Sequence, residues 1–374
     1  MRLRSRSVAR ATWLVAIAVV PAAASPALSQ VVIDDPGQGP VLLQDVAAVS
    51  PEELGALTWR GGAFATGDRF FSLSDNNADV FDLRVDIDPA SGTITTAQTV
   101  GIDATVTGGG GDFESISRFV DAGNGRLVIA SEGSNTLLLY PGENAAATPT
   151  PLAPPVPFPG NFAAGNFGLE SVAANADGSV IYTTSEAPLT VDTAGLHRLV
   201  RFDGTTAGKQ VAFAPTPATG FFLNQAISGV VDLEVLPNGD LLVLERAFGP
   251  GNLTQGRSLA MISWIKAADL NAALDVSGDP QLIAGFLGVP ATVLWQKAFD
   301  VTQPANFEGM ALGETLDDGR VSLLLISDDG DLSQSFLTYD PEPWLYPLIV
   351  TIPEPSSLTA MLGVLALGMR RRVV

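Results

Sequence analysis

The sequence contains no cysteine and a single histidine, His197, among its 374 residues. Without cysteine, disulfides, thiol nucleophiles and cysteine-ligated zinc sites are excluded, and one histidine excludes the metal centres that need several. A Ser-His-Asp triad would have to use His197, and the sequence has no Gly-x-Ser-x-Gly motif to go with it. Whatever chemistry this chain performs must therefore rely on carboxylates.

Basic residues are also scarce, with 20 Lys and Arg against 40 Asp and Glu and a formal net charge of −20. Residues 1–30 and 353–374 hold seven of the arginines and one glutamate, so the rest of the chain carries 13 basic and 39 acidic residues, a charge of −26. A body of this charge repels phosphate backbones, so we expect no nucleic-acid binding. The 46% of hydrophobic residues still provides enough apolar surface for a globular fold.

Sustained helical periodicity is missing between about residues 54 and 340, apart from a short stretch over 266–276. Four segments instead share one layout, in which an acidic residue precedes a strand-like run, an Asn-Gly or Asp-Gly turn, a second run and a closing acidic residue. These turns are strong hairpin signals. The four segments are Glu114–Glu132, Glu170–Glu186, Glu234–Glu245 and Glu308–Asp328, and a looser copy turns at Gly67-Asp68 and ends at Asp75.

A further strand is expected after each hairpin, over residues 81–88, 136–140, 196–203, 259–265 and 335–340. Repeated units of this kind bury their faces by stacking, and radial closure protects their edges. The sequence therefore predicts an all-β, single-domain β-propeller of six blades, within a range of five to seven, over residues 30–352. The N-terminal strands or residues 293–301 would complete the sixth blade, and a β-sandwich or two smaller β domains is the alternative.

The first residue of a hairpin lies beside the last, at the end opposite the turn. Four acidic pairs and Asp75 would thus meet on one face of the ring, unless they are ordinary solvated loop residues. Crowded carboxylates need raised pKa values or bound cations, and oxygen ligands select hard cations such as Ca²⁺. As metal ligands we predict the four residues that open the hairpins, Glu114, Glu170, Glu234 and Glu308. As candidate catalytic bases or further ligands we predict Asp75, Glu132, Glu186, Glu245 and Asp328.

Arg246, next to Glu245, is a candidate substrate-binding residue for an anion that enters the acidic face. Pairing with a neighbouring carboxylate is the alternative for this side chain.

The two ends of the chain have the composition of targeting signals. Residues 1–29 combine four arginines, an apolar stretch and small residues, which predicts an export signal peptide. Residues 353–374 combine Pro353-Glu354-Pro355, an apolar run and Arg370 to Arg372, and this combination resembles the PEP-CTERM sorting signal of Gram-negative bacteria. The resemblance implies an exosortase-type processing enzyme as partner, transient membrane association through the tail, and delivery to the cell surface or extracellular matrix. An ordinary C-terminal membrane anchor is the alternative, and in both cases the body is exported across the inner membrane.

Several motifs of the hairpins resemble the phytase-like domain family, usually labelled "esterase-like activity of phytase". They are Ser74-Asp75-Asn76, Phe113-Glu114-Ser115-Ile116, Leu169-Glu170-Ser171-Val172, residues 241–246, and Asn306-Phe-Glu-Gly-Met-Ala311 with residues 323–328. The resemblance implies a bacterial β-propeller that hydrolyses phosphoesters or esters. Two functions remain open from the sequence: a Ca²⁺-dependent hydrolase acting on a small anionic or ester substrate, and a non-catalytic, Ca²⁺-stabilised propeller that binds exopolysaccharide or another surface partner.

Overall fold

The computed structural model describes residues 30–45, 54–63, 67–74, 77–164, 167–215, 227–248, 258–299, 305–328 and 343–353. The predicted signal peptide, all but the first residue of the predicted sorting tail, and Asp75 lie outside these residues. Within the part described, no helix is long and apolar enough to cross a membrane.

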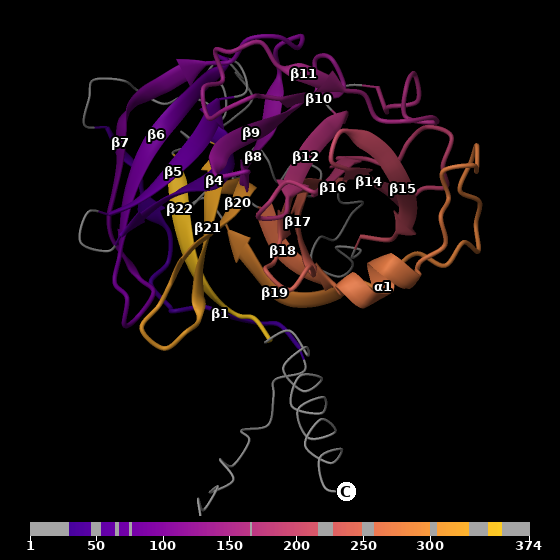
Figure 1. The fold of residues 1–374 in the computed structure, drawn as a ribbon. Coiled ribbons are helices and arrows are strands. Elements are labelled where there is room, and N and C mark those ends of the chain that lie inside the picture. The colour runs from indigo at the N-terminus through magenta and orange to yellow at the C-terminus, as the bar shows by residue number, and fades with distance from the viewer. Residues whose placement is uncertain are drawn as a thin grey trace, which may run out of the picture.

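Five small sheets, here numbered blades 1 to 5 along the chain, are arranged around a common centre (Figure 1). In blade 1 the strands are β4 (Leu54–Ala63), β5 (Gly67–Ser74), β6 (Asp79–Ile87) and β7 (Ile94–Thr105), with β3 (Gln44–Asp45) added parallel to β7. In blade 2 they are β8 (Phe113–Asp121), β9 (Asn124–Ser131), β10 (Thr136–Leu139) and β11 (Thr150–Leu152). In blade 3 they are β12 (Leu169–Ala174), β13 (Val180–Ser185), β14 (His197–Asp203) and β15 (Thr206–Phe213).

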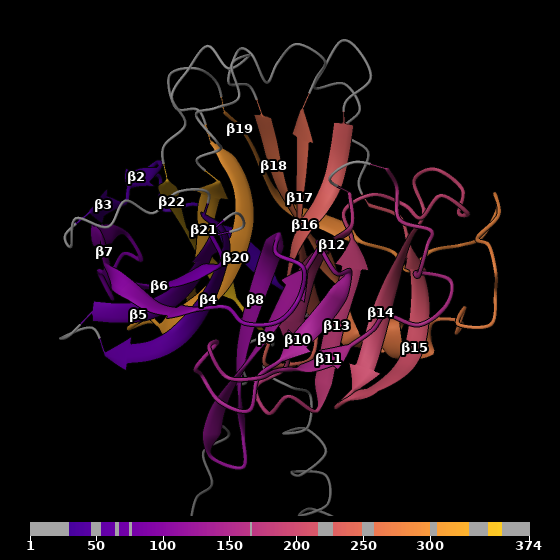
Figure 2. The ribbon, with the colours of Figure 1, turned by 90° about the horizontal axis from the view of Figure 1, so that it is seen from above.

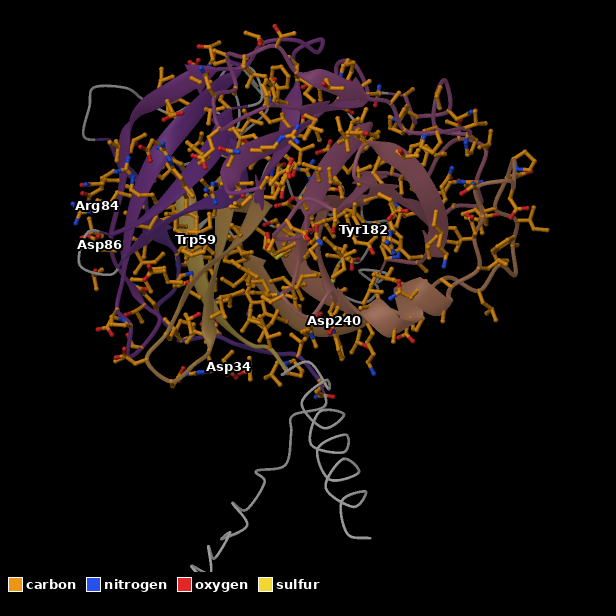
Figure 3. All side chains as sticks on the ribbon, viewed as in Figure 1. Asp34, Trp59, Arg84, Asp86, Tyr182 and Asp240 are labelled. Atoms are coloured by element: carbon orange, nitrogen blue, oxygen red, sulfur yellow. The ribbon has the colours of Figure 1, made fainter. Side chains whose placement is uncertain are left out.

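Blade 4 contains the only helix of the described residues, α1 (Ala267–Ala272), between its third and fourth strands. Its strands are β16 (Ile227–Val235), β17 (Leu241–Phe248), β18 (Ser258–Ile265) and β19 (Thr292–Phe299). In Figure 2, the antiparallel strands β16, β17 and β18 stand side by side, and all three extend toward one end of the molecule. Asp240, labelled in Figure 3, links the β16–β17 turn to the helix, because its Oδ1 accepts a hydrogen bond from the Ala267 amide at 2.8 Å.

Blade 5 joins the two ends of the domain. It is built from β20 (Asn306–Thr315), β21 (Val321–Asp328), β22 (Trp344–Thr351) and the N-terminal β1 (Val32–Asp34), and β2 (Val41–Leu42) also pairs with β22. The first strand of each blade, β4, β8, β12, β16 and β20, contacts the first strand of the next blade, and β20 contacts β4. These inner strands therefore form a closed ring, and the protein is a β-propeller, whose ring axis we call the central channel.

The ring has five blades, so the predicted number of six is wrong. Both segments proposed for a sixth blade serve as outer strands of other blades: residues 293–301 fall largely in β19, the fourth strand of blade 4, and β1 completes blade 5. Each sheet has at least four strands rather than the three predicted, and these segments supply the fourth strand of blades 4 and 5.

Most hairpins and third strands appear where the sequence predicts them, with local shifts. The predicted turn at Gly67-Asp68 is wrong, since both residues already belong to β5 and pair with Ala63 and Gly62. The predicted turn at Asn124-Gly125 is also wrong, since both residues belong to β9 and the chain turns at Ala122-Gly123. The third strand of blade 5 is β22, whereas the predicted strand over 335–340 lies outside the described residues. The helix predicted over 266–276 is shorter, at Ala267–Ala272.

His197 is buried inside blade 3, where its Nδ1 lies 3.2 Å from the Ser185 carbonyl oxygen. Burial lowers the pKa of His197 to about 4, against a smaller opposing effect of this carbonyl and of Asp192. The imidazole is therefore neutral at physiological pH, and His197 packs inside the sheet as a structural residue of β14.

Candidate functional site: the acidic rim of the ring

The inner strand of every blade carries a β-bulge close to its first residues. The bulge falls at the same step of the register in each blade, so the bulged residues occupy equivalent places around the ring. The bulged residues are Gly55, Glu114, Glu170, Val231 and Glu308. On the second strand of each blade, the residue before the bulge has a pairing partner, and the residue that follows this partner forms a second equivalent set. Its described members are Glu132, Glu186, Arg246 and Asp328. We call this end of the channel the acidic rim.

Three of the four predicted acidic pairs lie at the acidic rim, namely those of blades 2, 3 and 5. Blade 4 differs because β16 begins at Ile227 and not at Glu234. Glu234 pairs with Leu242, near the β16–β17 turn, whereas Glu245 pairs with Val230 at the other end of the strand. The structure therefore separates Glu234 from Glu245 and from the rim.

The blade 2 corner of the rim gathers three carboxylates. Oxygen atoms of Asp112, Glu114 and Glu132 all lie within 4.8 Å of one another, and the two glutamates are buried. Glu132 Oε1 accepts a short hydrogen bond from the Gly168 amide, while its buried Oε2 accepts none from the described residues. Only glycine permits this approach, because a Cβ at position 168 would lie 2.6 Å from Glu132 Cγ.

Burial makes the negative charge of this corner costly. It raises the pKa of Glu132 to about 7, opposed by the Gly168 hydrogen bond and reinforced by the charges of Asp112 and Glu186. Burial also raises the pKa of Glu170 well above its usual range, and Glu114 and Glu186 add to the effect. Burial therefore favours the protonated carboxyls of this corner, and a bound cation would favour the carboxylates instead.

The opposite side of the rim carries its own cation, Arg246. Its Nε and Nη2 atoms lie 3.1 and 2.9 Å from Glu186 Oε1, and Nη1 contacts Glu308 Oε1. Although burial alone lowers the pKa of Arg246, the charges of Glu186 and Glu170 raise it above its usual value. Arg246 is therefore paired with rim carboxylates of blades 3 and 5. This agrees with the alternative given for its sequence, in which the side chain pairs with a neighbouring carboxylate.

A family model described as "Phytase-like: Esterase-like activity of phytase" matches residues 54–331, a span that includes the bulges of all five blades. The chain belongs to this phytase-like family. No curated protein matches it.

Solved structures similar to the phytase-like chain include three enzymes. A thermostable family-43 glycoside hydrolase is 10% identical, with 81% of this chain and 90% of that chain covered and a TM-score of 0.44. The α-L-arabinofuranosidase PaAbf62A from Podospora anserina, in complex with cellotriose, is 12% identical, with 84% and 96% covered and a TM-score of 0.44. The periplasmic gluconolactonase PpgL from Pseudomonas aeruginosa is 14% identical, with 82% and 90% covered and a TM-score of 0.37.

The remaining predicted site residues of the phytase-like domain, Glu245, Glu308 and Asp328, accept hydrogen bonds from neighbouring side chains. Glu245 is buried within blade 4 and accepts a hydrogen bond from Ser263 Oγ at 2.6 Å. Asn306 Nδ2 donates to Glu308 Oε1 at 2.6 Å and to Asp328 Oδ2 at 3.3 Å, which ties the two acids of blade 5 together.

Two acids of the site region, Asp112 and Asp232, are absent from the sequence-based prediction. Asp112 directly precedes the Phe113-Glu114 motif and has a left-handed φ of 57°, a conformation that aspartate tolerates better than most residues. Asp232 lies in an apolar run, which hides its role. Its carboxylate accepts hydrogen bonds from Ser115 Oγ (2.8 Å), the Met310 amide (2.7 Å) and the Leu233 amide (2.9 Å), and so links blades 4, 2 and 5 below the rim.

Proposed function

We propose that this phytase-like domain is a Ca²⁺-dependent hydrolase of phosphate esters or carboxylic esters, with its active site at the blade 2 corner of the acidic rim. The observation that carries the proposal is the group of Asp112, Glu114 and Glu132, whose oxygen atoms lie within 4.8 Å of one another. Family membership supports an ester substrate.

The donor set of this corner fits a hard divalent cation. All three candidate ligands are carboxylates, and the buried Oε2 of Glu132 accepts no hydrogen bond from the described residues, so a ligand position is open. A bound Ca²⁺ would supply positive charge that polarises the ester and offsets the repulsion between an anionic substrate and a body of charge −26.

The neighbouring residues can move the protons. Burial raises the pKa of Glu170 well above its usual range, which favours the protonated carboxyl that can donate a proton to the oxygen of the leaving group. Glu186, held by Arg246, presents a carboxylate beside Glu170 that can accept the proton of the attacking water. The bond from water oxygen to the phosphorus or acyl carbon forms as the ester bond breaks.

We also propose that the enzyme acts outside the cell. Residues 1–29 and 353–374 support export across the inner membrane, processing of the tail by an exosortase-type enzyme, and a final position at the cell surface or in the extracellular matrix. Expression in a Gram-negative host, with N-terminal sequencing and mass analysis of the mature protein, tests both cleavages.

Turnover measurements test the proposed reaction. The purified chain is assayed with p-nitrophenyl phosphate, phytate and p-nitrophenyl acetate, in Ca²⁺ and in chelator. We expect activity that needs Ca²⁺ and that falls about a hundredfold in Glu170→Gln, because the proton donor is lost. Glu143→Gln, the same change at a partly exposed residue paired with Arg118, is the matched control and should retain activity. Calcium binding without turnover on any of these substrates would contradict the hydrolase and favour a propeller that only binds a surface partner.

A further inference from the structure

A cavity of about 440 Å³ lies at the other mouth of the central channel. All five blades contribute to its wall, so it sits on the ring axis. One lining residue from each blade is Trp59, Phe119, Asn175, Glu234 and Leu312. Two other residues of the wall, Val120 and Val235, pair with Gly125 and Leu241 next to the hairpin turns, which places the cavity at the end of the channel opposite the acidic rim.

Most polar groups of the wall are already used to join neighbouring strands. Thr58 Oγ1 accepts a hydrogen bond from the Arg118 amide and Ser117 Oγ accepts one from the Ala174 amide, both at 3.0 Å. The Arg118 guanidinium pairs with Glu143, with an N–O distance of 2.6 Å, so its charge is balanced. The cavity therefore offers no unbalanced cation among the described residues of its wall.

Two wall residues keep polar groups that the described part of the chain does not satisfy. The indole Nε1 of Trp59, a residue labelled in Figure 3, is buried and donates no hydrogen bond to any described residue. Glu234 is half-buried, and among the described residues its carboxyl makes no hydrogen bond or ion pair. Burial raises the pKa of Glu234, and the charge of Asp232 adds to the effect. A buried polar group without a partner costs free energy, so these two groups favour a ligand that satisfies both.

The two groups have different needs, which narrows the class of ligand. The Trp59 N–H needs an acceptor, which an ammonium ion cannot supply. An anion would accept from Trp59 but would meet Glu234 with no free cation beside it, inside a body of charge −26. A neutral hydroxyl group both donates and accepts, so it suits Trp59 and Glu234 together. The apolar side chains of Phe119, Val235 and Leu312 suit the C–H face of a sugar ring, and the volume is within the roughly 300–1,000 Å³ usual for small-molecule sites.

We propose that the cavity opposite the acidic rim is a binding site for a neutral saccharide, with Trp59 as hydrogen-bond donor and Glu234 as acceptor or donor to its hydroxyl groups. The site shares no residue with the proposed ester-hydrolysing corner. It would bind either a free sugar or one unit of a longer chain.

Isothermal titration of the full chain tests the proposal. The probes are methyl glycosides of glucose, galactose, mannose and N-acetylglucosamine and their hexasaccharides, with choline chloride and inorganic phosphate as charged comparisons. We expect at least one saccharide to bind, and affinity to fall about tenfold in Trp59→Phe and in Glu234→Leu, which corresponds to one lost hydrogen bond. Binding of methyl glycosides indicates a site for free sugars, whereas binding of hexasaccharides alone indicates a site for chains.

Two variants serve as controls. Glu132→Gln alters the acidic rim only and should bind saccharide as the wild type does, and thermal unfolding checks that each cavity variant is folded. If Trp59→Phe fails this check, Glu234→Leu decides. The proposal is wrong if no saccharide binds, if only choline or phosphate binds, or if the folded cavity variants keep wild-type affinity.

Discussion

The two halves of the acidic rim use the same scaffold positions in opposite ways. In blades 2 and 3 both the bulged residue and its partner are glutamates, and burial raises the pKa of Glu132 and Glu170. In blade 4 the same two positions hold Val231 and Arg246, and the arginine pairs with Glu186 and with Glu308 of blade 5. One side of the rim therefore has an internal cation, since Arg246 serves Glu186 of blade 3 and Glu308 of blade 5. The other side, the blade 2 corner with Glu114 and Glu132, depends on protons or a cation from solution. A repeated backbone position fixes where a charge sits but not its sign.

The largest effect is expected from removing the internal cation. Arg246→Met leaves Glu186 and Glu308 without their partner in a largely buried setting, and should lower the free energy of unfolding by about 3–5 kcal/mol. Urea unfolding of the purified chain measures it. Arg201→Met removes the partner of Asp203 in a much more exposed pair and should cost less than about 1 kcal/mol. Equal losses in the two variants would show that the Arg246 pairs stabilise the rim no more than an exposed ion pair does.

The half without an internal cation should be sensitive to pH. The folded pKa of Glu132, about 7, lies above its ordinary value of 4.5, so the folded chain holds this proton more tightly. Its contribution is complete below about pH 4.5 and is lost as pH rises through 7, by about 3 kcal/mol in total. His197, with its lowered pKa, acts in the opposite direction below about pH 6.5.

The readout is therefore the difference in unfolding free energy between the wild type and Glu132→Gln, measured in chelator from pH 5 to 8. As pH rises, the unfolding free energy of the wild type should fall relative to that of Glu132→Gln. A difference that stays constant with pH would mean that Glu132 is solvated like an ordinary carboxylate.

Calcium should replace these protons in one half only. At a concentration a hundred times its dissociation constant, Ca²⁺ should raise the free energy of unfolding by about 2.7 kcal/mol at pH 7.5. Glu132→Gln should remove this gain, and the matched change Glu308→Gln, in the half that contains Arg246, should leave it in place. The reverse pattern would move the cation site to blade 5.

The smallest effect is expected at the link between the halves. Ser115 Oγ of blade 2 donates to Asp232 of blade 4 and accepts from the Val172 amide of blade 3 at 3.1 Å. Ser115→Ala should therefore cost about 1–2 kcal/mol in urea unfolding. Ser179→Ala removes a hydroxyl that accepts an exposed hydrogen bond from Asn175 and should change stability by less than about 0.5 kcal/mol. A loss at Ser115 no larger than at Ser179 would show that the link is not important.

Local patterns in the sequence were sufficient to predict the propeller and three of the four acidic pairs. Asp-Gly turns lie between the paired strands of blades 3 and 5, whereas blade 2 turns at Ala122-Gly123, two residues before the Asn-Gly pair. The register of these three hairpins places Glu114, Glu170 and Glu308 at one rim. Glu234 misled the prediction because the same acid-run-turn pattern appears when a strand starts earlier, at Ile227. Local spacing cannot show where a strand begins within a long apolar run.

The blade count and the role of Arg246 depend on contacts between distant parts of the chain. Nothing near Val32 in sequence indicates that it pairs with Thr351, or that Arg246 reaches carboxylates of two other blades. Asp112 was identifiable in principle, because it adjoins the Phe113-Glu114 motif after a run of glycines.

The pairing of β1 with β22 determines when the domain can finish folding during its synthesis. Blade 5 cannot be completed until Thr351 has left the ribosome, so the domain reaches its final form only after all five inner strands have been made. Once β22 is in place, most of its side chains are buried up to Val350. A protease that cut the chain after residue 353 would therefore leave every described strand in place, and the five-bladed ring would keep its shape.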